Sequence, residues 1–160
     1  MTPSAPKSCL ARLLLFGLIG SALATPAFGA SAKFKVLGIR ATNEDKPHID
    51  EELLPLKDTL GLFPFNSFRV AAKQRVTAEI GESAEVPLIE DHAMRLEPQD
   101  ETSKGVRLVV TILRYEKDEK GKRFGRVVER TSMTIRKGKF LFGGGFTLKE
   151  GVLITLVAAE

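Results

Sequence analysis

Apolar and polar residues alternate along most of this chain, with the period of two that predicts β-strands. The longest regular stretch covers residues 106–116, in which four aliphatic side chains share one face. A polar segment centred on Lys120-Gly121 follows, and residues 124–136 return with the same period. We therefore expect an antiparallel hairpin here. The same pattern predicts shorter strands at residues 33–42, 68–74, 76–80, 84–90, 93–97, 139–142 and 151–158.

The returning strand of this hairpin is expected to have one apolar and one basic face. Strict alternation places Val127, Met133 and Ile135 together. It places Arg126 and Arg130 on the opposite face, together with Ser132, Thr134 and Arg136. The apolar face should pack on the core and the other should meet solvent.

The spacing changes to three and four between residues 49 and 60, which predicts the one helix of the chain. The residues with this spacing are Ile49, Leu53, Leu56 and Leu60. Pro55 lies inside the segment and removes a backbone donor, so we expect a kink or two short pieces. Gly61 should end the helix.

Eight or nine short strands and one helix favour a mainly β fold. We predict a single domain over residues 30–160, an antiparallel β-sandwich or open barrel with one short N-terminal helix. A parallel α/β sheet needs a helix between successive strands, and this chain has only one such crossover. Residues 98–105 and the glycines at 143–145 are expected to lie in loops.

Residues 1–29 have the pattern of a signal peptide. Lys7 and Arg12 precede a 12-residue apolar run at 13–24, followed by small residues at 27 and 29. The run is too short for a spanning helix, which needs about 20 residues. Cleavage is expected before Ala30, with Thr25 as the alternative. We therefore expect an exported protein, periplasmic or extracellular, with no transmembrane segment in the mature chain.

Loss of this leader also removes Cys9, the only cysteine. The mature chain then has no disulfide, no thiolate nucleophile and no sulfur ligand for a metal. A lipid anchor on Cys9 is not expected, because this residue precedes the apolar run and leaves with it.

Charge is distributed unevenly along the mature chain. Residues 30–103 contain 9 basic and 14 acidic side chains, whereas residues 104–139 contain 12 basic and 4 acidic ones. Such a basic segment can attract anionic partners. Alternatively, the two segments lie side by side and partly neutralise one another. The candidate anion-binding residues are Arg114, Lys117, Lys120, Lys122, Arg123, Arg126 and Arg130.

Catalytic, metal and cofactor signatures are weak. His48 precedes three carboxylates, which a metal could use but which the positive end of a helix also favours. His92 is expected in a hairpin turn. The glycines at 143–145 lack the lysine and hydroxyl of a phosphate-binding loop, so a turn, a bulge or a close backbone contact explains them better. We therefore predict no catalytic residue, no metal and no cofactor.

Three short segments resemble a group of small exported bacterial β-rich proteins of unassigned function. They are Phe65-Asn66-Ser67-Phe68, the glycines at 138, 143 and 144, and Gly151-Val152-Leu153-Ile154. Residues 136–145 are also similar to a strand and glycine element of secretins, the outer-membrane secretion channels. The resemblance implies a place in the cell envelope and supplies no catalytic or binding residue.

These observations leave two functional hypotheses. The first is a non-catalytic envelope module that joins a secretion or surface assembly, or binds an anionic envelope component. Nucleic acid is not expected as a partner of an exported protein. The alternative is an envelope hydrolase whose carboxylates, such as Glu79, Glu85 or Glu97, meet only in the folded chain.

Overall fold

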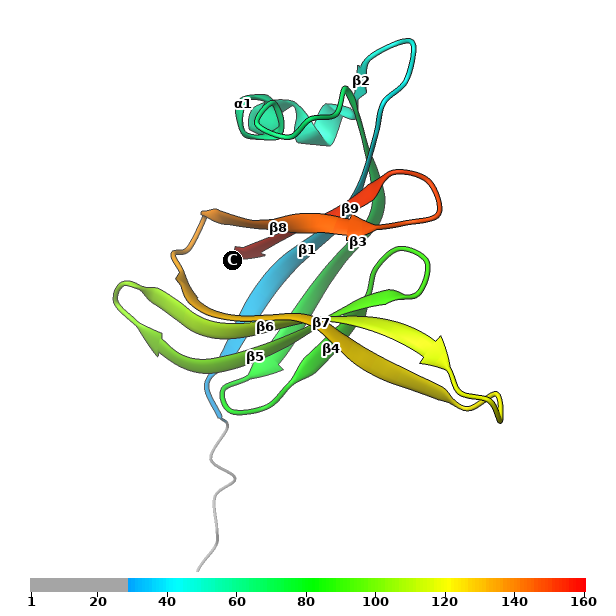
Figure 1. The fold of residues 1–160 in the computed structure, drawn as a ribbon. Coiled ribbons are helices and arrows are strands. Elements are labelled where there is room, and N and C mark those ends of the chain that lie inside the picture. The colour runs from blue at the N-terminus through cyan, green and yellow to red at the C-terminus, as the bar shows by residue number, and fades with distance from the viewer. Residues whose placement is uncertain (1–28) are drawn as a thin grey trace, which may run out of the picture.

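In a computed structural model, residues 29–160 are described. They form a mainly β fold of two sheets (Figure 1). One sheet has the spatial order β2 (His48–Ile49), β3 (Ser67–Glu79), β1 (Ser31–Thr42), β9 (Val152–Ala159) and β8 (Phe140–Thr147). The other has the order β4 (Ala84–Pro87), β5 (His92–Thr102), β6 (Gly105–Lys117) and β7 (Arg123–Ile135). The predicted sandwich or open barrel is confirmed. The expected leader, including Cys9, lies outside the described residues except for Gly29.

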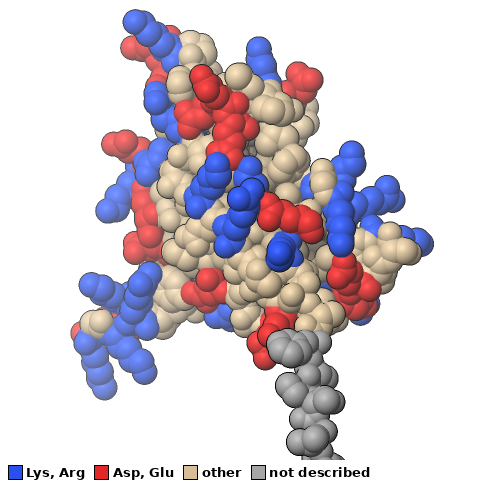
Figure 2. Space-filling view, turned by 180° about the vertical axis from the view of Figure 1, so that it is seen from behind, with Lys and Arg blue, Asp and Glu red and all other residues tan. Residues whose placement is uncertain are grey.

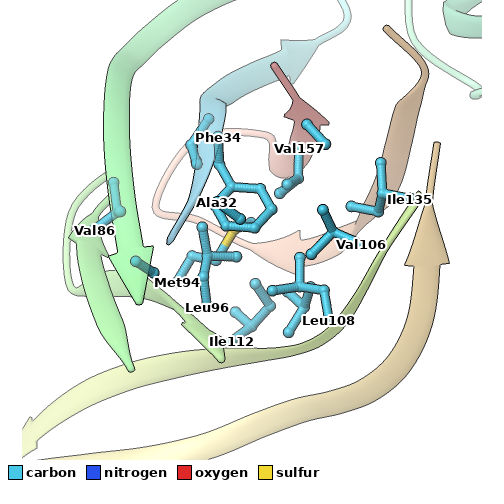
Figure 3. Packing of buried hydrophobic residues seen from close by; sticks show 14 residues of the cluster. Ala32, Phe34, Val86, Met94, Leu96, Val106, Leu108, Ile112, Ile135 and Val157 are labelled. Atoms are coloured by element: carbon cyan, nitrogen blue, oxygen red, sulfur yellow. The ribbon is translucent and has the colours of Figure 1, made fainter. Parts of the chain in front are cut away.

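The two sheets enclose the main core of apolar side chains. Phe34 of β1 is completely buried and points toward side chains of β5 and β6 (Figure 3). Met94, Leu96 and Leu108 are buried around it from the opposite sheet. Burial of such side chains contributes roughly 1.5–3 kcal/mol each. This contact between the sheets therefore supplies much of the driving force for folding.

The predicted helix forms as two short pieces, a 3₁₀-helix η1 (Glu51–Leu56) and an α-helix α1 (Lys57–Leu60). Pro55 lies inside η1, which confirms the interruption that the sequence predicts. Leu53 and Leu60 are fully buried in a second apolar cluster with Phe68. No helix among the described residues has the length and apolar character to cross a bilayer.

Two predicted strand boundaries are wrong because neighbouring strands extend the sheet through polar sequence. The segments 68–74 and 76–80 form one strand, β3, since β1 pairs with it from Ser67 to Glu79. The expected loop after residue 97 is the second half of β5, which pairs with β6 as far as Thr102. Pro98 is tolerated there because its carbonyl accepts from the Gly81 amide, so its donor-free side faces away from β6.

The glycines expected between strands lie inside β8, which pairs with β9 from Phe140 to Thr147. The register shifts between Gly144 and Phe146, and Gly145 has a φ of 92°. This is a β-bulge at a residue that glycine suits. The bulge predicted as one explanation of these glycines is therefore confirmed, whereas the loop is not.

Gly105 begins β6 with a φ of 138°, and a β carbon there would overlap the carbonyl oxygen of Ile135. Gly121 has a φ of 76° but open space around it. We expect Gly105→Ala to lower the free energy of unfolding by about 1 kcal/mol more than Gly121→Ala, because both have left-handed backbones and only the first also clashes. Urea unfolding of both variants measures the difference. Equal losses would contradict the close approach of β6 and β7 at this point.

Candidate functional site

The β6–β7 hairpin projects beyond the body of the sandwich (Figure 1). Lys and Arg side chains gather at its projecting end, at the lower left of Figure 2. Lys117, Lys120, Lys122 and Arg123 lie in or beside the connecting turn. Asp118 holds this turn closed by accepting from the amides of Lys120 and Lys122 at 2.9 and 2.8 Å. The hairpin therefore presents a basic end that is fixed by its own backbone.

Closer to the body, three nitrogen-bearing side chains form a row across the sheet, which we call the basic row. His92 of β5 pairs with Arg114 of β6, and Arg114 pairs with Arg126 of β7. Directly paired residues of antiparallel strands project from the same face. The basic row therefore crosses three strands at one level and faces the other sheet.

The basic row lines a hollow of about 360 Å³, the basic hollow. Gly145, Phe146 and Thr147 of β8 form its opposite wall. Val128 of β7 lines it as well and is 45% exposed, whereas neighbouring Val127 pairs with Leu113 on the other face of the sheet. The hollow thus combines two guanidinium groups, an imidazole and one carboxylate, that of Glu116, with apolar residues. Its wall has an excess of positive charge, which suits an anion with an apolar part.

Arg114 and Arg126 are directly opposed although both are cationic. Like charges at such positions are destabilising. Arg40 and Arg69 are likewise opposed in the other sheet, but each of them binds a carboxylate there. Glu116 offsets the repulsion only in part, because its carboxylate lies 3.7 Å from Arg126. An anion between the two guanidinium groups would relieve this repulsion, since each is a strong donor to anionic oxygen.

His92 is held in place by the loop that precedes it. Its amide donates to the Ile89 carbonyl at 3.1 Å, and its carbonyl accepts from the Leu88 amide at 2.9 Å. Glu90, with a φ of 55°, accepts from Arg40 and from the Lys149 amide. These contacts connect the loop to β1 and to the turn after β8. His92 thus closes the predicted hairpin turn with its amide and is also the first residue of β5.

His92 as a whole residue is only 6% exposed, and its Nδ1 atom has no hydrogen-bond partner among the described residues. The centroid of its ring lies 6.3 Å from that of Phe146. Burial lowers the pKa of His92, and the Arg114 guanidinium lowers it further. The imidazole is therefore neutral at neutral pH and keeps an unused polar atom beside the hollow.

Two β-bulges flank the basic hollow. One is at Gly145 of β8, and the other is at Val128 of β7, the residue left over where Ile112 pairs with Glu129 and Leu113 with Val127. Bulges redirect side chains and often occur beside functional sites. The bulge at Val128 corrects the predicted faces of this strand. Arg126 lines the hollow between the sheets, whereas Arg130 binds Glu97 at 3.3 Å on the other face.

The candidate basic residues therefore divide into three groups. Arg114 and Arg126 line the hollow, and the turn residues lie at the projecting end. Arg123 lies over the Tyr115 ring, 4.1 Å from its centroid. Arg130 is neutralised by Glu97, and pairs of Arg107 with Asp100 and of Lys137 with Glu101 likewise join the basic to the acidic segment. Partial neutralisation of the basic segment, one of the two alternatives from the sequence, therefore occurs at Arg107, Arg130 and Lys137.

The carboxylates near His48 belong to the packing of η1 against the sheet. Asp50 accepts from the Val70 amide at 2.7 Å and binds His48 Nε2 at 2.8 Å. These two contacts, the amide first, lower the pKa of Asp50. Glu52 binds Lys35 and Lys73 at 2.7 and 2.9 Å. Within residues 29–160, no group of three or more histidine, cysteine or carboxylate side chains is placed to hold a metal.

The carboxylates of the hydrolase hypothesis are divided between the two sheets. Glu79 ends β3 in one sheet, whereas Glu85 and Glu97 belong to the other. Glu85 accepts from the Tyr115 hydroxyl and binds Arg95. Glu97 binds Arg130. These contacts give Glu85 and Glu97 each a cationic partner, and none of the three carboxylates lines the basic hollow.

His92 is the member of the site that sequence reasoning missed. The predicted hairpin contains Arg114 and Arg126, but no periodicity specifies which residue of the preceding strand lies beside Arg114. The one signal in the sequence is a histidine that directly precedes an apolar strand segment. Comparisons of the chain with family models, with curated proteins and with solved structures gave no match.

Proposed function

We propose that the mature chain is an exported, non-catalytic module of the bacterial envelope that binds an anionic envelope component in the basic hollow. The observation that carries this proposal is the basic row, in which two arginines directly oppose one another on a face that meets open space. A sheet that serves only as scaffold gains by placing opposite charges there. The retained repulsion is explained if an anion completes the arrangement.

The surroundings of the hollow support the same interpretation. No carboxylate among the described residues lies within ion-pair distance of Lys117, Lys120 or Lys122, so these cations keep their charge available at the hairpin end. Exposed charges of one sign attract a diffusing anion and lose this effect as salt rises. The hairpin would thus guide an anionic component toward the basic row.

The proposal is tested with the double variant Arg114→Glu/Arg126→Glu and soluble extract of bacterial envelopes. The unchanged protein should retain anionic material at about 0.05 M salt and release it at about 0.5 M, because screening shortens the reach of the charges. The variant should retain none at either concentration. Thermal unfolding of the variant checks that the sheets still close.

Lys104→Glu/Arg136→Glu is the matched control. Both residues lie beside the opposite end of the same hairpin and line a different hollow. The control alters the net charge by the same amount, so it should retain envelope material like the unchanged protein. Equal loss in both double variants would reduce the effect to net charge alone, and equal retention would contradict the proposal.

A further inference from the structure

A second opening follows the basic hollow along the same two edge strands. Val128 of β7 lines the hollow, and Glu129, Thr131 and Met133 of β7 line the second opening. On β8, Gly145 lines the basic hollow and Gly143 lines the second opening. We call this opening the apolar groove. It lies between the sheets where β7 and β8, each paired on one side only, end the two layers.

The apolar groove has a volume of about 150 Å³, and aliphatic or aromatic side chains form most of its wall. The apolar part consists of Met94, Val110, Ile112, Met133, Leu141 and Val157, which belong to the inter-sheet cluster. An enclosed apolar cavity of similar volume in another protein takes up benzene, and here Glu129, Thr131 and Thr155 form the polar remainder of the wall. The groove can therefore accept an apolar chain of several carbon atoms, and water gains little by entering it.

From this arrangement we infer that the anionic component is a lipid, with its charged group at Arg114 and Arg126 and an acyl chain in the apolar groove. The inference rests on the proposed function and adds the chemical class of the ligand. Charge complementarity defines the orientation, because the hollow has two guanidinium groups against the single carboxylate of Glu116, whereas Glu129 is the one charged side chain that lines the groove. An uncharged chain has no conflict with Glu129.

The edge strands themselves argue against a peptide strand as the occupant. A strand added to β7 or β8 needs a regular row of free amides and carbonyls. Both edges carry a bulge next to the hollow, at Val128 and at Gly145. Bulges interrupt such rows and protect edges from added strands.

The test uses alkanesulfonates, whose charged group is constant while the chain grows from methane- to decanesulfonate. Binding is measured by titration calorimetry below the micelle concentration. Affinity should rise about fourfold for each methylene buried and level off after roughly six to eight carbons. A decyltrimethylammonium ion has the same chain and the opposite charge, so it should bind at least tenfold more weakly than decanesulfonate.

Thr131→Phe fills the groove from inside, and Ser132→Phe places the same ring on the other face of β7 as its control. The first variant should bind methanesulfonate normally and lose the gain with chain length, whereas the second should keep both. A second groove variant, Met133→Lys, gives the same result if Thr131→Phe does not fold.

The outcomes separate the lipid inference from the proposed function. Binding of methanesulfonate without any gain from the chain overturns the lipid inference and leaves the anion site intact. A chain-length gain that survives Arg114→Glu/Arg126→Glu supports the groove and contradicts the proposed function. Absence of binding by every sulfonate overturns both, and a gain undiminished in both groove variants overturns the assignment of the chain to this groove.

Discussion

Phe34→Ala is expected to lower the free energy of unfolding by about 3–5 kcal/mol. The Phe34 ring is fully buried between the two sheets, among side chains of β5 and β6 that belong to the other layer (Figure 3). Removing the ring takes away apolar burial and leaves a cavity that the strands cannot close, because each is held in register by its neighbours. Urea unfolding followed by circular dichroism measures the loss.

Phe140→Ala is the control for this prediction. Phe140 begins the edge strand β8 and is 44% exposed. Its removal should cost less than about 1 kcal/mol, since a partly exposed ring on an edge leaves no closed cavity. A similar cost for both variants would contradict the packing of one sheet on the other through Phe34. It would also remove the basis for a groove between the layers.

The sequence was a good guide wherever a single strand or helix determined the pattern. The alternation in residues 106–116 predicts β6, and the spacing of Leu53 and Leu60 predicts the short helices that pack on the sheet. Each of these patterns arises from one element with one buried side. Such local regularity needs no knowledge of the neighbouring strands.

The sequence failed where a neighbouring strand decided the outcome. Polar residues 98–102 read as a loop, yet pairing with β6 keeps them in β5. Strict alternation placed Arg126 and Arg130 on one face, but the extra residue at Val128 puts them on opposite faces. A one-residue bulge reverses the side-chain order after it. The basic row depends on that reversal, so its two arginines could be identified as candidates from the sequence but could not be assembled into a site with His92.

The basic row also predicts how binding should respond to pH. His92 adjoins Arg114 in the row, with Glu90 and Asp91 in its own loop and Phe146 across the hollow. Its pKa in the free protein is lowered by burial and by the Arg114 guanidinium. A bound anion would favour the charged imidazole and raise this pKa. The bound state then holds more protons than the free state, so affinity must increase as the pH falls.

We expect decanesulfonate to bind more tightly at about pH 5.5 than at about pH 7.5, by up to about tenfold if the bound anion raises the pKa of His92 by one unit, because the sulfonate charge is constant. The stability of the free protein should change in the opposite direction. The unfolded histidine takes up a proton at higher pH than buried His92 does, so acidification through this range favours unfolding. Calorimetry and urea unfolding at the two pH values measure the two effects separately.

His92→Gln removes the titrating ring and keeps a polar side chain, so affinity for decanesulfonate should become nearly independent of pH. His48→Gln is the control, because His48 is the only other histidine in the chain. It lies exposed beside Asp50 on β2, at the edge of the five-stranded sheet opposite β8. The control should leave the pH response intact. A response that persists in His92→Gln, or one of opposite sign in the unchanged protein, would contradict a role for His92 beside the bound anion. A response lost only in His92→Gln would make this buried imidazole the part of the basic row that adjusts its charge to the ligand.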